Sequence, residues 1–177
     1  MINKKEKEII KILKNDGVGI IPTDTLYGLV GSAFSKKAVN RIYKIKKRNK
    51  NKKLIVLVSS INDLKKFKIP DCLIRANRRI LEKVWPGKVS VILNNIAFRL
   101  PAKKSLIEIL KKTGPLVAPS ANPEVLKPAE NIKQAKKYFG DKVDFYLSGG
   151  TLKSQPSILI KINKKGEIEV LRGRIKI

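Results

Sequence analysis

Polar side chains suited to binding anions follow three apolar segments of this 177-residue chain. They are Thr23, Asp24 and Thr25, then Ser120 and Asn122, and finally Ser157. Lys46 and Arg48 add cations from the very basic segment 46–53. Because open sheets place ligand groups at strand ends, we expect these side chains to converge. Hydroxyls, an amide, bidentate arginine and mobile lysine charges together bind phosphate and carboxylate oxygens.

The composition excludes several kinds of chemistry. The chain has no histidine, so a Ser-His-Asp triad and a histidine-based metal site are both ruled out. Phosphoryl or nucleotidyl transfer needs mainly positioning and charge neutralisation, so an enzyme that handles ATP is chemically sensible. Neither G-x-x-x-x-G-K-[ST] nor G-x-G-x-x-G occurs, which argues against a familiar nucleotide-binding fold.

Each candidate group also has an ordinary structural interpretation. The stretch 17–34, GVGIIPTDTLYGLVGSAF, is compatible with a plain strand and turn, in which Gly28 and Gly31 supply either a positive φ or a close approach. Lys46 and Arg48 fit a solvated basic turn. The Ser-Ala-Asn sequence at 120–122 fits a helix cap or an Asx turn.

The elements that must position these groups alternate between strands and helices, which predicts an α/β fold. Expected helices cover 3–16 (with Gly17 as C-cap), 36–46, 60–67, 70–84, 105–112 and 131–139. Expected strands cover 18–22, 54–58, 89–93, 98–100, 116–119, 145–147, 157–162 and 169–171, the last two joined by a turn at 164–166. Some connections are too short for a crossover helix, so the sheet should be mixed, parallel and antiparallel, and flanked by helices.

Length favours one domain over residues 1–177. No apolar stretch approaches the roughly 18 residues of a membrane span, and the charged start lacks a signal-peptide core. Because no stretch could span a membrane, we expect no membrane partner. The single cysteine, Cys72, allows no internal disulfide, which fits a cytoplasmic protein. The net charge of +26 favours either a nucleic-acid partner or a compositional bias toward lysine, and we assign most lysines to bias and a few to function.

Nine motifs in order resemble those of the YrdC/Sua5 family, the threonylcarbamoyl-AMP synthases. They are PTDTLYGLVG, IKKR, KKLIVLV, WPGKVSVIL, FRLP, APSAN, VDFYLSGG, QPSI and VLRG. The resemblance extends from Gly17 to Gly173 and corresponds to the short form, with only the YrdC-like domain. It implies a twisted mixed sheet with a large, positively charged concave face.

The resemblance also implies a reaction and its partners. L-threonine, bicarbonate and ATP, with Mg²⁺ held by phosphates and water, would give L-threonylcarbamoyl-AMP and pyrophosphate, a nucleotidyltransferase reaction. The product would serve N6-threonylcarbamoyladenosine formation at position 37 of tRNA. Implied partners are tRNA or double-stranded RNA and a downstream tRNA threonylcarbamoyl transferase complex. No protein residue is expected to ligate a metal.

Site roles follow from the same resemblance. Lys46 and Arg48, which match the family's Lys-x-Arg, are the expected catalytic cations. The expected ATP-binding residues are Lys46, Arg48, Lys52, Ser120, Asn122 and Arg172. The expected threonine-binding residues are Thr23, Thr25, Arg99 and Ser157. The sequence departs from common family motifs at Asn49, Leu57, Glu124-Val125 and Ile158, which replace Pro, His, Ser-Gly and Thr.

Two alternatives remain at this point. One is a non-catalytic RNA-binding or ribosome-assembly protein of the same fold, which the charge supports. The other is a related enzyme with different carbamoyl chemistry. The intact set of Lys46, Arg48, Ser120 and Asn122 favours the synthase, because RNA affinity alone does not require that arrangement.

Overall fold

The computed structural model describes residues 3–163 and 166–175. Its α-helices are α1 (Lys4–Lys14), α2 (Lys36–Lys46), α3 (Asp71–Val84), α4 (Lys104–Thr113) and α5 (Ile132–Phe139), and its 3-10 helices are η1 (Ile61–Phe67) and η2 (Gly140–Lys142). Its strands are β1 (Gly19–Pro22), β2 (Tyr27–Ser32), β3 (Ile55–Leu57), β4 (Val89–Leu93), β5 (Ile96–Arg99), β6 (Leu116–Val117), β7 (Phe145–Tyr146), β8 (Ile158–Ile162) and β9 (Ile168–Arg172).

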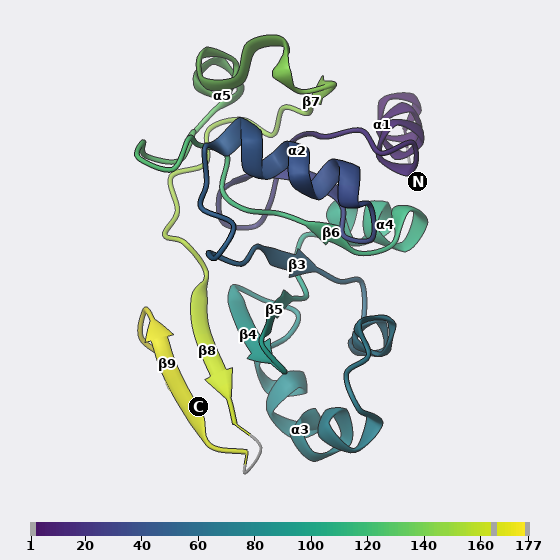
Figure 1. Ribbon diagram of the computed structural model, residues 1–177, viewed down its shortest axis with the longest axis vertical. Coiled ribbons are helices and arrows are strands. Elements are labelled where there is room, and N and C mark those ends of the chain that lie inside the picture. Colours follow the sequence, from purple (N-terminus) through teal and green to yellow (C-terminus); the bar gives the residue numbers. More distant parts are fainter. Residues whose placement is uncertain (1–2, 164–165, 176–177) are drawn as a thin grey trace.

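Within the described residues the strands form a nine-stranded sheet in the order β7-β1-β2-β6-β3-β5-β4-β8-β9 (Figure 1). Three neighbouring pairs are parallel, namely β1 with β7, β3 with β5, and β4 with β8. The other five pairs are antiparallel. The predicted mixed sheet is therefore confirmed. The predicted β8–β9 hairpin is present, and Lys164 and Lys165 of its turn lie outside the described residues.

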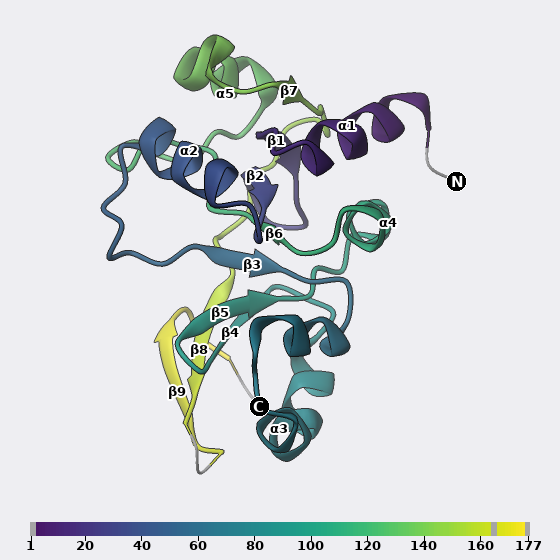
Figure 2. The same cartoon turned by 45° about the vertical axis from the view of Figure 1, so that its right-hand side comes forward.

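Helices cover both faces of the sheet (Figures 1 and 2). α1 and α4 pack together through Ile9, Leu13, Leu106 and Ile109 on one face. α2, α3 and α5 contribute to a second apolar cluster on the other face. The start of α2 is determined by local sequence. The Ser35 hydroxyl accepts a hydrogen bond from the N–H of Ala38 and so caps the helix at its predicted first turn.

β2 was not predicted, and it forms a hairpin with β1. Two glycines weaken the strand pattern of 27–32, because glycine lowers strand propensity. The structure shows why Gly31 is suitable there: a Cβ would lie 3.1 Å from both Ala38 and Val18. Close packing, and not a positive φ, therefore explains Gly31.

The prediction that Gly17 caps α1 is wrong. The C-cap is Asn15, and Asp16 takes the left-handed conformation with φ of 62°. Gly17 instead lies against the helix, where a Cβ would fall 2.3 Å from Cγ2 of Ile12. The glycine thus permits close approach one residue beyond the turn. Among the described residues, no helix combines the length and apolar character that crossing a membrane requires.

Candidate active site

A small cavity brings together polar residues from distant parts of the chain. It has a volume of about 130 Å³. Six of the predicted site residues line it: Thr23, Thr25, Arg99, Ser120, Ser157 and Arg172. They come from the β1–β2 turn, the end of β5, the loop after β6, the start of β8 and the end of β9. The predicted convergence of three polar segments is therefore observed.

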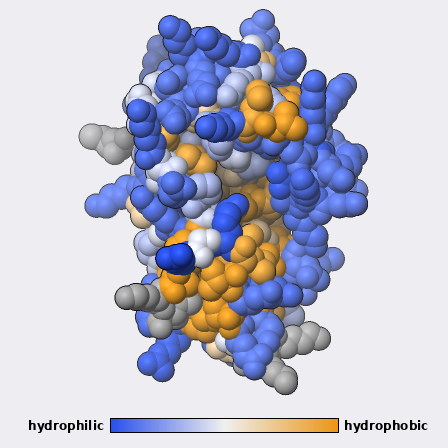
Figure 3. Space-filling model, turned by 90° about the vertical axis from the view of Figure 1, so that its left-hand side faces the viewer, coloured by the Kyte–Doolittle hydropathy of each residue, from blue (hydrophilic) through white to orange (hydrophobic). Residues whose placement is uncertain are grey.

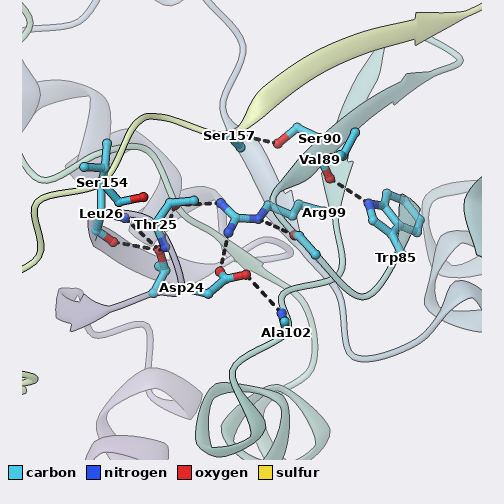
Figure 4. A network of polar contacts seen from close by, with 12 residues as sticks. Asp24, Thr25, Leu26, Trp85, Val89, Ser90, Arg99, Ala102, Ser154 and Ser157 are labelled. Carbon is cyan, nitrogen blue, oxygen red and sulfur yellow. Dashed lines mark hydrogen bonds and ion pairs between the residues drawn. The ribbon is translucent and has the colours of Figure 1, made fainter. Parts of the chain in front are cut away.

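Arg99 is the centre of the cavity's hydrogen-bond network (Figure 4). Its Nε donates to the carbonyl of Gly87 at 3.0 Å, and its Nη1 donates to Oγ1 of Thr25 at 2.8 Å. Its Nη2 forms an ion pair with Asp24, whose other oxygen accepts the N–H of Ala102 at 3.0 Å. Arg99 is only 4% exposed, so these contacts hold the guanidinium in one orientation.

Asp24 is a site residue that the sequence analysis left without a role. It lies between the two threonines of the turn, and its partner Arg99 is 75 positions away in the chain. Burial lowers the pKa of Arg99 and the Asp24 carboxylate opposes that effect. The only signal in the sequence was the presence of a carboxylate in a hydroxyl-rich turn, which does not identify a partner.

The two threonines of the turn have different roles. Oγ1 of Thr23 donates to the carbonyl of Leu26 at 2.7 Å and accepts the N–H groups of Thr25 and Leu26, so it stabilises the turn itself. Oγ1 of Thr25 lies 3.1 Å from that of Thr23 and also accepts from Arg99. Thr25 therefore connects the turn to the cavity's cation.

A second arginine, Arg172, also lines the cavity. Nε of Arg172 donates to the carbonyl of Ser157 at 3.0 Å, and its Nη2 lies 3.3 Å from the Ser157 hydroxyl. That hydroxyl also lies 2.9 Å from the hydroxyl of Ser90. Burial lowers the pKa of Arg172, and the charge of Arg172 in turn contributes to the lowered pKa of Arg99. Two cations that line one cavity and repel each other favour the binding of an anionic ligand there.

The remaining wall of the cavity is apolar. It is formed by Leu26, Ile55, Leu57, Ala118, Pro128 and Pro156, together with Tyr27 and Gly28. Figure 3 shows the face of the molecule on which β8 and β9 lie, where apolar side chains gather over the lower half. The cavity thus combines a cationic end with walls that fit a short aliphatic group.

Lys46 does not line this cavity. Its side chain is fully buried beneath the loop that follows β6, where its ammonium donates to the carbonyls of Ser120 and Asn122, each at 2.5 Å. Burial, with a smaller contribution from Arg48, lowers its pKa to about 8. The structure therefore places this predicted catalytic lysine as a support of the Ser120–Asn122 loop.

The other predicted ATP-binding residues surround the same loop. Oδ1 of Asn122 accepts from the Ser120 hydroxyl at 2.6 Å, and its Nδ2 donates to the carbonyls of Pro123 and Leu126. Arg48 donates to the carbonyls of Lys52 and Lys53. The ammonium of Lys52 pairs with Glu124. We call Ser120, Asn122, Arg48 and Lys52 the basic rim. Of these four residues, Ser120 lines the cavity and the others lie outside it.

The lowered pKa of Lys46 predicts how stability changes with pH. Below pH 8 the lysine is charged in both states, and the folded state bears the full cost of a buried charge. In the unfolded chain Lys46 has its ordinary pKa of 10.5. Between pH 8 and 10.5 the folded protein has therefore lost the Lys46 proton, while the unfolded chain still holds it. The free energy of unfolding, relative to Lys46→Met, should therefore rise by about 3 kcal/mol between pH 8 and 10.5. Urea unfolding of both proteins across this range measures the difference, and a flat difference would contradict the burial argument.

The described residues contain no group of three or more Cys, His, Asp or Glu side chains placed to hold a metal ion. Asp24, which does not itself line the cavity, is paired with Arg99 and with the N–H of Ala102.

A mixed α/β sheet with a cavity lined by two arginines, of which Arg99 is buried and Arg172 is exposed, defines a class of proteins equipped to bind anions. Within that class, residues 11–173 match the Sua5/YciO/YrdC family, described as "Telomere recombination". The chain belongs to this family.

Named relatives extend over most of the chain. A protein of Methanocaldococcus jannaschii, provisionally named a threonylcarbamoyl-AMP synthase, is 30% identical over 194 aligned positions that cover 99% of this chain and 91% of the relative. The threonylcarbamoyl-AMP synthase of Hahella chejuensis is 29% identical and covers 81% of this chain and 85% of its own. Both of these relatives are named for the same enzymatic activity.

Solved structures confirm the fold. Pyrococcus abyssi Sua5, solved in complex with L-threonine, superimposes with a TM-score of 0.82 at 21% identity and covers 95% of this chain. The present chain spans about half, 53%, of that longer protein. Escherichia coli YciO superimposes with a TM-score of 0.82 at 20% identity, covering 96% of this chain and 88% of its own.

Proposed function

We propose that this protein is an L-threonylcarbamoyl-AMP synthase, a nucleotidyltransferase that converts L-threonine, bicarbonate and ATP into L-threonylcarbamoyl-AMP and pyrophosphate. Two relatives that align with most of the chain bear this enzyme name. The non-catalytic RNA-binding alternative is less favoured, because RNA binding does not require a small cavity with a buried, fully oriented arginine.

The observation that carries the proposal is the position of Arg99 in the cavity. Arginine has five N–H groups, and three of its nitrogens already hold Gly87, Thr25 and Asp24. The remaining N–H groups on the two Nη atoms are suited to a substrate carboxylate. A cavity of about 130 Å³ lies below the roughly 300–1,000 Å³ of pockets for drug-sized ligands, so it suits a small amino acid.

ATP is too large for this cavity, so most of it must lie outside. We assign its phosphates to the basic rim formed by Ser120, Asn122, Arg48 and Lys52, with Lys46 supporting the loop from beneath. Arg172 lies at the cavity's edge and can meet the reacting phosphate. Mg²⁺ would be held largely by the phosphates of ATP and by water, and would supply neutralisation of phosphate charge.

No side chain of the cavity is an obvious general base, so the proton that the threonine ammonium must lose goes to solvent. The threonine amine and bicarbonate give a carbamate with loss of water. A carbamate oxygen attacks the α-phosphorus in line, the bond between that phosphorus and the bridging oxygen breaks, and the electron pair leaves with pyrophosphate. Arg99 orients the threonine carboxylate, and Arg172 with the basic rim offsets charge on the phosphates.

Two partners complete the proposal. The product is an activated acyl donor in water, so direct transfer to a tRNA threonylcarbamoyl transferase complex would protect it from hydrolysis. tRNA or double-stranded RNA is the matching polyanion for a chain with 40 lysines and arginines against 14 acidic residues.

Pyrophosphate release should depend on both L-threonine and bicarbonate. With both present we expect turnover, and with either one omitted we expect release to fall to background, because the attacking carbamate cannot form. A coupled phosphate assay measures the rate, and D-threonine serves as the matched control. Release that ignores threonine, accompanied by tight salt-sensitive tRNA binding, would instead favour the RNA-binding alternative.

A further inference from the structure

Glu124 links the loop after β6 to the basic segment that follows α2. Its Oε1 lies 2.5 Å from Nζ of Lys52, and its Oε2 accepts the backbone N–H of Asn49 at 3.1 Å. Its own backbone N–H donates to the carbonyl of Lys46 at 3.0 Å. The carboxylate therefore receives an ammonium and a main-chain N–H, which are donors that proteins also present to phosphate oxygens.

The basic segment is shaped to present these donors. The guanidinium of Arg48 donates to the carbonyls of Lys52 and Lys53, at 3.0 and 3.3 Å. The N–H of Lys52 donates to the carbonyl of Asn49 at 3.0 Å, and Oδ1 of Asn49 accepts the N–H of Asn51. These bonds close 48–53 into a compact turn. Because the turn is held by its own contacts, its donors stay in place when the carboxylate departs.

The ion pair between Glu124 and Lys52 is weak enough for a competing anion to replace the carboxylate. The Lys52 side chain is 61% exposed and that of Glu124 is 22% exposed. Because the ammonium of Lys52 is largely in solvent, water and salt screen the pair, and it contributes little to stability. The hydrogen bonds from Lys52 and Asn49, with the nearby charge of Arg48, lower the pKa of the Glu124 carboxyl, so it is an anion at neutral pH.

We propose that Glu124 is an internal competitor for the phosphate chain of ATP. Its carboxylate occupies the Asn49 N–H and the Lys52 ammonium in the free protein, and a polyphosphate displaces it from both. This inference rests on the proposed function, because it takes ATP as the ligand of the basic rim. Its consequence is that the chain binds ATP more weakly than the cations of 46–53 alone would allow.

Removing the competing charge should tighten polyphosphate binding. For Glu124→Gln we expect inorganic tripolyphosphate and ATP to bind about three- to tenfold more tightly than to the unchanged protein, measured by calorimetry without threonine. Glu82→Gln is the matched control. Glu82 lies on α3 and pairs with Arg78 at 2.8 Å, so it loses the same charge and a comparable ion pair at a distance from the rim. We expect its effect to be less than about twofold.

A double-mutant cycle identifies the partner. In a Lys52→Met background, Glu124→Gln should change tripolyphosphate affinity by less than about twofold, because the contested ammonium is gone. Unchanged or weaker binding in Glu124→Gln, equal tightening in Glu82→Gln, or tightening that persists with Lys52→Met would each overturn the proposal. These measurements omit turnover, so they remain decisive even if pyrophosphate release proves independent of threonine.

Discussion

Exchanging Arg99 for lysine should lower threonine-dependent pyrophosphate release by about 100-fold or more. The guanidinium contacts Gly87, Thr25 and Asp24 through three different nitrogens, and a single ammonium cannot reach all three while also orienting a carboxylate. We expect most of the loss in kcat/KM for threonine at saturating ATP. Steady-state pyrophosphate assays with threonine varied measure it.

Stability separates an effect on the site from an effect on folding. Arg99→Lys keeps a positive charge beside Asp24, so the protein should remain folded. Arg99→Ala leaves the buried carboxylate unpaired, which should cost about 3–5 kcal/mol of unfolding free energy. Arg41→Lys is the matched control, because Arg41 makes a bidentate pair with Asp144 at a position about a third exposed, away from the cavity. It should cost about 1 kcal/mol or less and leave turnover intact. Full activity in Arg99→Lys would remove Arg99 from the threonine site.

Lys46→Met should likewise lower turnover by about 100-fold or more, although the lysine does not reach the cavity. Methionine matches the buried stem, but it leaves the carbonyls of Ser120 and Asn122 without their donor. The loop that carries Ser120 and Asn122 then loses its fixed position, and the basic rim loses its alignment with the cavity. Pyrophosphate release and the affinity for ATP should both fall.

Lys46→Met should have two opposing effects on the free energy of unfolding. Two unsatisfied carbonyls destabilise by about 1–3 kcal/mol each, while loss of a buried charge whose pKa is lowered to about 8 offsets this by about 3 kcal/mol. Near neutral pH the net change should therefore lie between about 1 kcal/mol of stabilisation and about 3 kcal/mol of destabilisation, which thermal unfolding measures. Lys44→Met, at an exposed position of the same helix, is the matched control and should leave the rate within about twofold. Normal turnover in Lys46→Met would show that the loop does not depend on this ammonium.

Local sequence determined most of the elements and the family. Ser35 and the apolar spacing predicted α2 with its observed bounds, because capping and helical periodicity are local properties. Short connections between expected strands predicted a mixed sheet for the same reason. The order of motifs predicted membership of the Sua5/YciO/YrdC family, and the family match to residues 11–173 confirms it. β2 was missed because its glycines oppose a strand until neighbouring backbone packs against them.

Only the tertiary structure shows which cations line the cavity and which are buried elsewhere. Lys46, Arg99 and Arg172 carry the same formal charge in the sequence, yet two line the cavity and the third lies fully buried under a loop. The pairing of Arg99 with Asp24 spans 75 positions and depends on β5 and the β1–β2 turn meeting across the sheet. Charge, burial and pKa are set by long-range neighbours, which the strand order determines and no local pattern contains.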